Sequence, residues 1–265
     1  MTFFQIYFQA LVMIMIMMSI LWIISVILRN VSIVDLFWGF GFVLTTGFYF
    51  IRTDGLGPRK VILLILVSIW GLRLSGYLTW RNLGKGEDYR YRQFRSKYGE
   101  KRYWWISFFQ TFVLQGLLMW LISAPLLGAQ YYGQNIIAGI FDYSGIALWI
   151  IGFVFEAGGD YQLAVFKGDL SNKGKVLESG FWHYTRHPNY FGDSAVWWGY
   201  GLICLAAGSI LPVLGSLLMT ALIIKVSGVA LLEKNLKEKK PEYMEYLERT
   251  SAFFPWFPKK QHPSQ

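Results

Sequence analysis

The feature that most constrains the fold of this chain is a series of long hydrophobic stretches separated by short polar connections. Of its 265 residues, 54% are hydrophobic and only 15% are charged, whereas a soluble domain carries about 25% charged residues. A helix needs roughly 20 apolar residues to cross a bilayer core. About seven segments reach that length, near 3–28, 31–51, 61–80, 106–127, 143–166, 189–207 and 211–232. The pattern predicts an all-α polytopic membrane bundle of about seven transmembrane helices, with a cytoplasmic amphipathic helix at its C-terminal end.

The chain shows no heptad pattern, internal repeat or low-complexity tract, so we expect a single membrane domain over residues 1–265. The first hydrophobic segment lacks a basic leading region and a small-residue cleavage site, which predicts a retained anchor. The single Cys204 excludes a disulfide framework and a thiolate-rich metal site. The three histidines have no paired spacing. We therefore expect no metal.

The distribution of lysine and arginine predicts the orientation of the bundle. Eight of these residues lie in 81–105, four in 167–187 and seven after position 232, whereas 128–142 contains none. Because basic connections stay on the cytoplasmic side, the C-terminus is expected in the cytoplasm and the N-terminus outside. The membrane would be a bacterial inner membrane or one of the endoplasmic reticulum type. Three basic residues violate this arrangement, namely Arg52, Arg59 and Lys60.

Several polar side chains fall inside the hydrophobic segments. They are Asp35, Arg73, Tyr77, Glu156, Asp160, Asn189, Asp193 and Lys225. A charged group costs about 2.5–3.5 kcal/mol at the centre of a bilayer even on the lenient insertion scale, so these residues should face the interior of the bundle and find partners. A purely structural interpretation is also open: Asp35 would pair with Arg73, and Lys225 would extend to the interface. Glu156 and Asp160 could equally be interfacial residues at a helix end.

The densest group of polar side chains is the run RHPNYFGD at 186–193. It brings a guanidinium, an imidazole, an amide, a phenol and a carboxylate to the start of a hydrophobic segment. Pro188 suits the first turn of a helix, because its missing N–H would have no partner there. The N-terminus of such a helix attracts anions. The alternative is a simple helix cap with solvated neighbours.

The C-terminal tail continues the polar pattern. Tyr243, Tyr246 and Arg249 recur at helical spacing, and they suit contacts to a phosphate or a carboxylate. The aromatic segment FFPWFP at 253–258 is a poor candidate for free solution. We expect it to dock on the bundle, so that the tail closes the cytoplasmic face over the region of Arg186.

Taken together, these motifs resemble the membrane steroid 5α-reductase family. The resemblance covers roughly residues 143–258 and rests on GDYQL at 159–163, GFWHYTRHPNYFGD at 180–193, WWGYG at 197–201 and the tail. It implies that this half holds NADPH in a cavity open to the cytoplasm. The candidate cofactor-binding residues are Glu156, Asp160, Tyr184, Arg186, His187, Asn189, Asp193, Glu233, Tyr243, Tyr246 and Arg249.

The first part of the chain, 1–128, would then supply the helices on the substrate side. In the reductases a carboxylate on an early helix and a tyrosine polarise the ketone of the substrate, and the resemblance assigns these catalytic roles to Asp35 and Tyr77. Reduction of a conjugated enone requires a hydride donor and a hydrogen-bond donor at the carbonyl oxygen. A carboxyl group in an apolar cavity favours its neutral form and can donate. Aspartate replaces the glutamate of steroid-reducing members, so the lipid need not be a steroid.

We therefore expect an NADPH-dependent reductase of a carbon–carbon double bond in a hydrophobic, steroid-like or isoprenoid-like enone. Its partners would be this lipid substrate and membrane lipids, without nucleic acid or metal; the sequence does not indicate an oligomeric state. One alternative is an S-adenosylmethionine-dependent methyltransferase of the isoprenylcysteine carboxyl methyltransferase type, which shares the RHPxY segment. Another is a lipid-binding or transport protein without catalysis.

Overall fold

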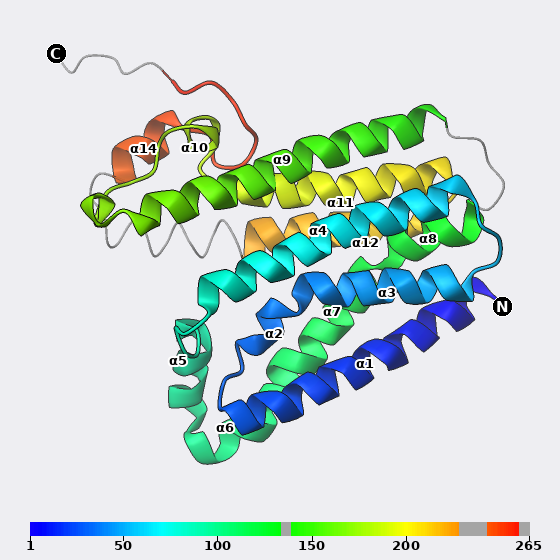
Figure 1. Cartoon of the computed structure of the whole chain (residues 1–265), viewed down its shortest axis with the longest axis horizontal. Coiled ribbons are helices and arrows are strands. Elements are labelled where there is room, and N and C mark those ends of the chain that lie inside the picture. Colours follow the sequence, from blue (N-terminus) through cyan, green and yellow to red (C-terminus); the bar gives the residue numbers. More distant parts are fainter. Residues whose placement is uncertain (134–138, 228–242, 260–265) are drawn as a thin grey trace. The chain divides into compact units, whose positions relative to one another are not determined.

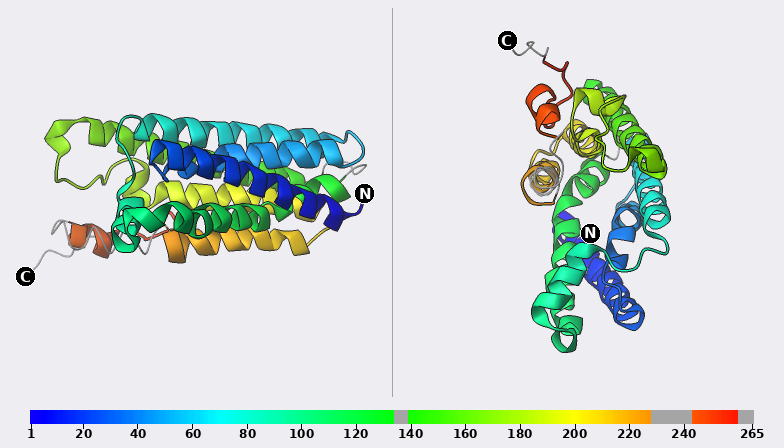
Figure 2. Two further views of the ribbon diagram at one scale, coloured as in Figure 1. Left: turned by 90° about the horizontal axis from the view of Figure 1, so that it is seen from below. Right: turned by 90° about the vertical axis from the view of Figure 1, so that its left-hand side faces the viewer.

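The computed structural model describes residues 1–133, 139–227 and 243–259, and this part of the chain is helical with no strand (Figures 1 and 2). The all-α prediction is confirmed for these residues. In chain order the helices are α1 (Phe3–Leu28), α2 (Ile33–Leu36), α3 (Trp38–Arg52), α4 (Pro58–Asn82), α5 (Tyr89–Tyr98), α6 (Glu100–Ser107), the π-helix η1 (Phe108–Val113), α7 (Leu114–Ile122), α8 (Ala124–Tyr132), α9 (Ile140–Gly168), the short η2 (Leu170–Asn172), α10 (Phe181–Tyr184), α11 (Pro188–Ala206), the short η3 (Leu211–Val213), α12 (Leu214–Leu222), the π-helix η4 (Ile223–Ser227) and α14 (Tyr243–Arg249).

Four helical stretches in the described part of the chain are long and apolar enough to cross a membrane. They cover Phe3–Leu28, Pro58–Asn82, Glu100–Tyr132 and Ile140–Gly168, and a shorter apolar helix covers Leu211–Lys225. The other two predicted spans coincide with α3, which has 15 residues, and α11, which has 19. A multi-pass membrane protein is therefore supported, whereas the predicted count of seven spans is not confirmed.

Local sequence signals explain where the first helices begin and end. Thr2 and Gln5 form a reciprocal capping box at the start of α1. Arg29 adopts a left-handed conformation with φ of 50° and ends the helix. The predicted span 31–51 is interrupted, because α2 ends at Leu36 before α3 begins. Asp35 therefore lies on a short separate helix and not early in a continuous span.

The residues form two compact units, and each unit combines two parts of the chain. The first unit comprises 1–139 and 204–215, and the second comprises 140–203 and 216–265. The sequence analysis divided the chain into 1–128 and 143–258, whereas residues 204–215 belong to the first unit. That the chain is a single domain stays a prediction.

In the first unit, α3 packs against α4 in antiparallel orientation through one close contact of glycines (Figure 1). A Cβ atom on Gly39 would lie 2.4 Å from the carbonyl oxygen of Gly71. Next to this contact the hydroxyl of Ser75 accepts a hydrogen bond of 2.9 Å from the backbone N–H of Phe40. The helices thus approach backbone to backbone, and a polar side chain fastens the crossing.

In the second unit, α9 and α11 lie side by side in antiparallel orientation along a ladder of glycines (Figure 1). A Cβ on Gly145 would meet the backbone oxygen of Gly199 at 2.8 Å, and one on Gly152 would meet that of Gly192 at 2.6 Å. Farther along, a Cβ on Gly159 would lie 3.1 Å from the ring of Pro188. The glycines recur every seven residues, about two helical turns, and the sequence predictions did not include this spacing. This ladder fixes the register of the two helices.

Two of the basic residues that violate the expected charge distribution have a structural explanation. Arg59 and Lys60, in the first turn of α4, are only 5% and 4% exposed. The Nζ atom of Lys60 donates to the carbonyl oxygens of Thr53 and Gly55 at 2.6 and 3.0 Å. These backbone oxygens accept from two of the three ammonium donors. Lys60 therefore anchors a connection and is not a topology signal.

Candidate active site

The first site residues in the second unit lie where α9 and α11 meet. The amide nitrogen of Asn189 donates a hydrogen bond of 3.1 Å to the carboxylate of Asp160. Asp160 is 6% exposed, next to Gly159, the glycine that packs against the first turn of α11. The helix begins at Pro188, as its sequence predicts. Two predicted cofactor residues are therefore in direct contact, at the N-terminal end of an apolar helix.

Two further carboxylates belong to the same pair of helices. Glu156 lies one turn before Asp160 on α9 and is 3% exposed. Its backbone nitrogen would be 2.3 Å from a Cβ on Gly192. Asp193 follows Asn189 by one turn on α11 and is half-buried. The expected convergence of these side chains on one helix interface is thus seen for the Asn189 and Asp160 pair, and Glu156 and Asp193 flank it in sequence.

Arg186 holds the C-terminal tail in place. Its guanidinium donates to the carbonyl oxygens of Leu247 and Thr250 at 2.8 and 2.6 Å, at the C-terminal end of α14. Its backbone N–H donates to the oxygen of Ser251 at 2.9 Å. A cation at this position complements the carbonyl groups that a helix leaves without partners. The predicted docking of the tail on the Arg186 region is therefore seen directly.

The tail makes further contacts with the segment before α11. The hydroxyl of Tyr246 donates to the backbone oxygen of Trp182, and Arg249 forms an ion pair with Glu178. The hydroxyl of Thr185 donates to the oxygen of Phe253 at 2.9 Å. Burial raises the pKa of Tyr246, so its phenol remains a neutral donor. The structure gives Tyr246 and Arg249 contacts that hold the tail; their role toward a cofactor stays a prediction.

The remaining predicted residues of this unit differ in exposure. His187 is 2% exposed and stacks on Tyr190 with 5.6 Å between ring centroids. Tyr243 is buried beside Tyr246, whereas Tyr184 is 39% exposed. Glu233 lies outside the described residues. In the aromatic segment, Phe253 is buried, but the side chains after it are 70–75% exposed, namely Phe254, Trp256 and Phe257.

In the first unit Asp35 is the centre of a hydrogen-bond cluster. Its carboxylate accepts from the guanidinium of Arg90 at 2.8 Å and from the hydroxyl of Tyr91 at 2.7 Å. The amide of Gln115 donates to Tyr91 at 3.3 Å and to Asp35 at 3.5 Å. The cation that pairs with Asp35 is therefore Arg90 and not Arg73. Asp35 acts as an acceptor here, whereas the sequence analysis expected a donor.

Two of the partners of Asp35, Arg90 and Tyr91, come from α5, which is fixed by its own polar contacts. Asp88 caps the helix by accepting from the backbone N–H of Arg90 at 3.0 Å. Its backbone N–H donates to the hydroxyl of Ser32 at 3.1 Å. Glu87 accepts from Arg95 at 2.8 Å and from the backbone of Val31 at 2.9 Å. The basic connection 81–105 is thus an ordered element clamped beside α2, rather than only a solvated face.

The second predicted catalytic residue, Tyr77, lies elsewhere on α4. Its ring is half-buried between two guanidinium groups, 6.0 Å from that of Arg73 and 5.6 Å from that of Arg81. The tyrosine in contact with Asp35 is Tyr91. Tyr91, Arg90 and Gln115 could not be predicted as partners, because more than 50 residues separate each of them from Asp35. The one available signal was local, since Asp88 before YRYRQFR marks the start of a helix.

The donors and acceptors of the second unit fit the hydroxyl and amide groups of a nucleotide. A carboxylate such as Asp160 accepts from ribose hydroxyls, and an amide such as Asn189 both donates and accepts. Among the described residues, no group of three or more His, Cys, Asp or Glu is arranged to hold a metal ion.

Comparison with known proteins places the chain in a family. Residues 21–250 match the family model described as "Protein of unknown function (DUF1295)". The chain is 26% identical over 261 residues to the "Uncharacterized protein C594.04c" of Schizosaccharomyces pombe, an alignment that covers 89% of this chain and 76% of that protein. No solved structure matches the chain. The matched residues cover most of the chain, which therefore belongs to the DUF1295 family.

Proposed function

We propose that this protein is an NADPH-dependent membrane reductase, which reduces a carbon–carbon double bond in a hydrophobic enone lipid of steroid-like or isoprenoid-like structure. The contact that carries the proposal is the hydrogen bond between Asn189 and Asp160. It places a carboxylate and an amide at the start of an apolar helix, and Arg186, which holds the tail, precedes Asn189 by three residues. Polar groups buried at such a position mark a functional site by default.

The second unit would bind the nucleotide. Asp160 and Asn189 are suited to its ribose hydroxyls and carboxamide, since these groups need an anionic acceptor and a neutral donor. Arg186 and Tyr246 would act indirectly, because their contacts hold the tail against the segment 178–187. The bound cofactor would supply a hydride to the β-carbon of the enone. The protein must then stabilise negative charge on the carbonyl oxygen and protonate the α-carbon.

The first unit offers a group suited to that carbonyl oxygen. Burial, followed by the negative charge of Asp35, raises the pKa of Tyr91, so the phenol stays protonated at neutral pH. Asp35 and Gln115 fix the orientation of this hydroxyl by their hydrogen bonds. Tyr91 therefore joins Asp35 and Tyr77 as a candidate for polarising the substrate. Its single O–H donates to Asp35 in this structure, so it would turn from Asp35 to the carbonyl oxygen when the substrate binds.

The experiment that tests the proposal is a titration of the protein, purified in detergent, with NADPH, followed by nicotinamide fluorescence. We expect saturable binding that weakens about ten-fold in Asn189→Ala and in Asp193→Ala, because one charged or bidentate hydrogen bond contributes on the order of 1.5 kcal/mol. Asp54→Asn, an exposed residue of the first unit, is the control and should bind as the wild type does. No binding of NADPH by the wild type would refute the proposal.

A second measurement tests the division of roles between the units. Asp35→Asn should retain NADPH affinity and slow turnover of an enone substrate, and Tyr91→Phe should do the same. Equal loss of nucleotide binding in Asp35→Asn would contradict this assignment. Binding of S-adenosylmethionine in place of NADPH would instead favour the methyltransferase, which shares the RHPxY segment.

We also propose the seven-span topology, with the N-terminus outside and the C-terminus in the cytoplasm. Helices occupy every predicted span position in the described residues, and the basic connections support the orientation. Cys204, the single cysteine of the chain, is buried. Labelling by a maleimide therefore reports on the introduced cysteine and not on Cys204. An impermeant maleimide added outside intact cells should label Asp54→Cys and not Lys101→Cys.

A further inference from the structure

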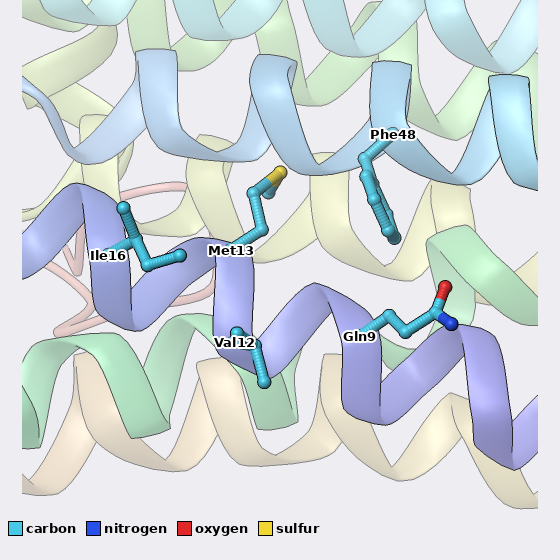
Figure 3. A pocket seen from close by; sticks show the side chains of 5 residues that line it. All are labelled: Gln9, Val12, Met13, Ile16 and Phe48. Atoms are coloured by element: carbon cyan, nitrogen blue, oxygen red, sulfur yellow. The ribbon is translucent and has the colours of Figure 1, made fainter.

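The first unit has a hollow on its surface between α1 and α3 that none of the proposed roles uses (Figure 3). Its volume is about 370 Å³, and it is lined by Gln9, Val12, Met13, Ile16 and Phe48. Figure 3 shows Met13 and Phe48 in the gap between the two helices. Along α1 the lining runs from position 9 to position 16, which corresponds to about 10 Å of helix. The hollow is thus a short apolar groove.

The apolar wall of the groove faces the surroundings of the helices and not the core of the unit. Val12 and Ile16 are 60% and 56% exposed, on a helix long and apolar enough to cross a membrane. In a membrane, side chains exposed on such a helix would contact lipid chains. Met13 can adapt its shape to an irregular occupant, because its side chain is unbranched and flexible.

One end of the groove is polar and positively charged. The guanidinium of Arg52, the last residue of α3, donates through Nε and a terminal nitrogen to the side-chain oxygen of Gln9, at 3.1 and 2.7 Å. The same guanidinium lies 5.9 Å from the ring centroid of Phe48. Arg52 is exposed, and within the described part of the chain no carboxylate pairs with it. A fixed, exposed guanidinium is suited to a phosphate group, which it can bind through two parallel hydrogen bonds.

We propose that this groove binds one acyl chain of an anionic glycerophospholipid, with the phosphate of the lipid at Arg52. The apolar wall matches the chain, and the charge at the end of the groove matches the head group. Gln9 orients the guanidinium and lines the groove, so it couples the two parts of the site. The inference is independent of the proposed reductase activity.

The test measures lipids that remain bound to the purified full-length protein by native mass spectrometry. Dioleoyl phosphatidylglycerol and dioleoyl phosphatidylcholine are added separately at equal concentration in detergent. The wild type should retain the phosphatidylglycerol about ten-fold more than the phosphatidylcholine, since a charge-assisted contact contributes on the order of 1.5 kcal/mol. Arg52→Gln should reduce this preference to near equality. An unchanged preference in Arg52→Gln would overturn the assignment of the head group.

Two tryptophan substitutions test the groove itself. Ile16→Trp should fill the groove and lower retention of both lipids several-fold. Ile20→Trp is the matched control, because Ile20 lies one turn farther along α1 and is 52% exposed but does not line the groove. Val12→Phe provides a second filling variant, and gel filtration verifies that each variant is folded. Equal retention in Ile16→Trp and the wild type, or equal loss in Ile16→Trp and Ile20→Trp, would overturn the proposal.

Discussion

The helix pairs α3–α4 and α9–α11 solve the same packing problem in different ways. Both bring backbones close together at glycines, but α3 and α4 do so once, at Gly39 and Gly71, whereas α9 and α11 do so at seven-residue intervals along the interface. Removing a side chain lets two helices approach and pack by dispersion contacts, which matters most where the surroundings are lipid. A single contact fixes a crossing point, and a ladder also fixes the register.

The pairs differ further in how each holds its carboxylate. Asp35 lies before α3 and is held by Arg90 and Tyr91, which come from α5, outside the helix pair. Asp160 lies within the α9–α11 interface and is held by Asn189 of the partner helix. The polar cluster of the first unit can therefore be changed without disturbing its helix packing. In the second unit, packing and the candidate nucleotide site depend on the same contacts.

The strongest test of this difference is a bulky side chain in the ladder. In Gly192→Leu the new Cβ would lie 2.3 Å from the backbone nitrogen of Glu156 and 2.5 Å from the oxygen of Gly152, and a backbone cannot move aside as a side chain can. We expect a loss of about 3 kcal/mol or more of stability, together with loss of NADPH binding. Thermal unfolding and gel filtration measure the first effect, and nicotinamide fluorescence measures the second.

The control for this variant is Gly76→Leu, because a Cβ at Gly76 of α4 meets no atom within 4 Å. Gly76→Leu should unfold at or slightly above the wild-type temperature, since leucine favours a helix more than glycine does. If Gly192→Leu were as stable as Gly76→Leu, the ladder would not hold α9 and α11 together.

The next effect in size concerns the first unit. Arg90→Gln removes the charged partner of Asp35, whose side chain is 23% exposed, while that of Arg90 is 40% exposed. We expect a destabilisation of about 1–2 kcal/mol, reduced from the value for a buried pair by this exposure. The connection that carries α5 should become more sensitive to trypsin, and NADPH affinity should not change. Arg92→Gln, an exposed change on the same helix, is the control and should change neither stability nor trypsin sensitivity. A loss of NADPH binding in Arg90→Gln would contradict the separation of the polar cluster of the first unit from the candidate nucleotide site.

The sequence predicts these features unequally, and the reason is the distance over which each contact acts. Hydrophobic length and the preference of Pro188 for the first turn are local properties, so the helices and the start of α11 could be predicted. Asp160 and Asn189 could be proposed as candidates, because each belongs to a compact motif on its own helix; their hydrogen bond is seen, and their role toward a cofactor stays a prediction. The break between α2 and α3 could not be predicted, since the apolar run continues through it.

Contacts between residues that are far apart in the sequence could not be predicted from local patterns. Arg90 and Tyr91 reach Asp35 across 55 and 56 residues, and the spacing within α5 carries no information about that partner. Arg186, beside a predicted helix N-terminus, suggested an anion site, yet its guanidinium donates to carbonyl oxygens of the tail. The glycine ladder was readable in principle. Its seven-residue spacing is visible at 145, 152 and 159 and again at 192 and 199.

A smaller effect on stability, but a clear one on binding, is expected for Asp160→Asn. The substitution preserves the shape of the side chain and leaves an oxygen that can accept from Asn189. Stability should therefore change by less than about 1 kcal/mol. NADPH affinity should fall about ten-fold, because the ribose hydroxyls lose an anionic acceptor. Asp169→Asn, on the exposed connection after α9, serves as the control. Unchanged NADPH affinity in Asp160→Asn would leave Asp160 with a packing role only.

The smallest expected effect is the pH dependence of the cap on α5. Burial opposes ionisation of Asp88, but the hydrogen bonds and the positive charge of Arg90 outweigh it, so the pKa of Asp88 in the folded protein is lowered. A carboxyl whose pKa is lower in the folded than in the unfolded state stabilises the protein above about pH 4 and loses this contribution as the pH falls through the folded pKa. The side chain is 33% exposed, so the contribution should not exceed about 1 kcal/mol.

Asp88→Asn keeps the cap but lacks the charge. The difference in unfolding temperature between the wild type and Asp88→Asn should be present at pH 7 and should shrink toward pH 3, because the wild type then loses its charge too. A difference that stayed constant over this range would show that the carboxylate of Asp88 acts by shape alone, and that the cluster around Asp35 depends less on charge than its geometry indicates.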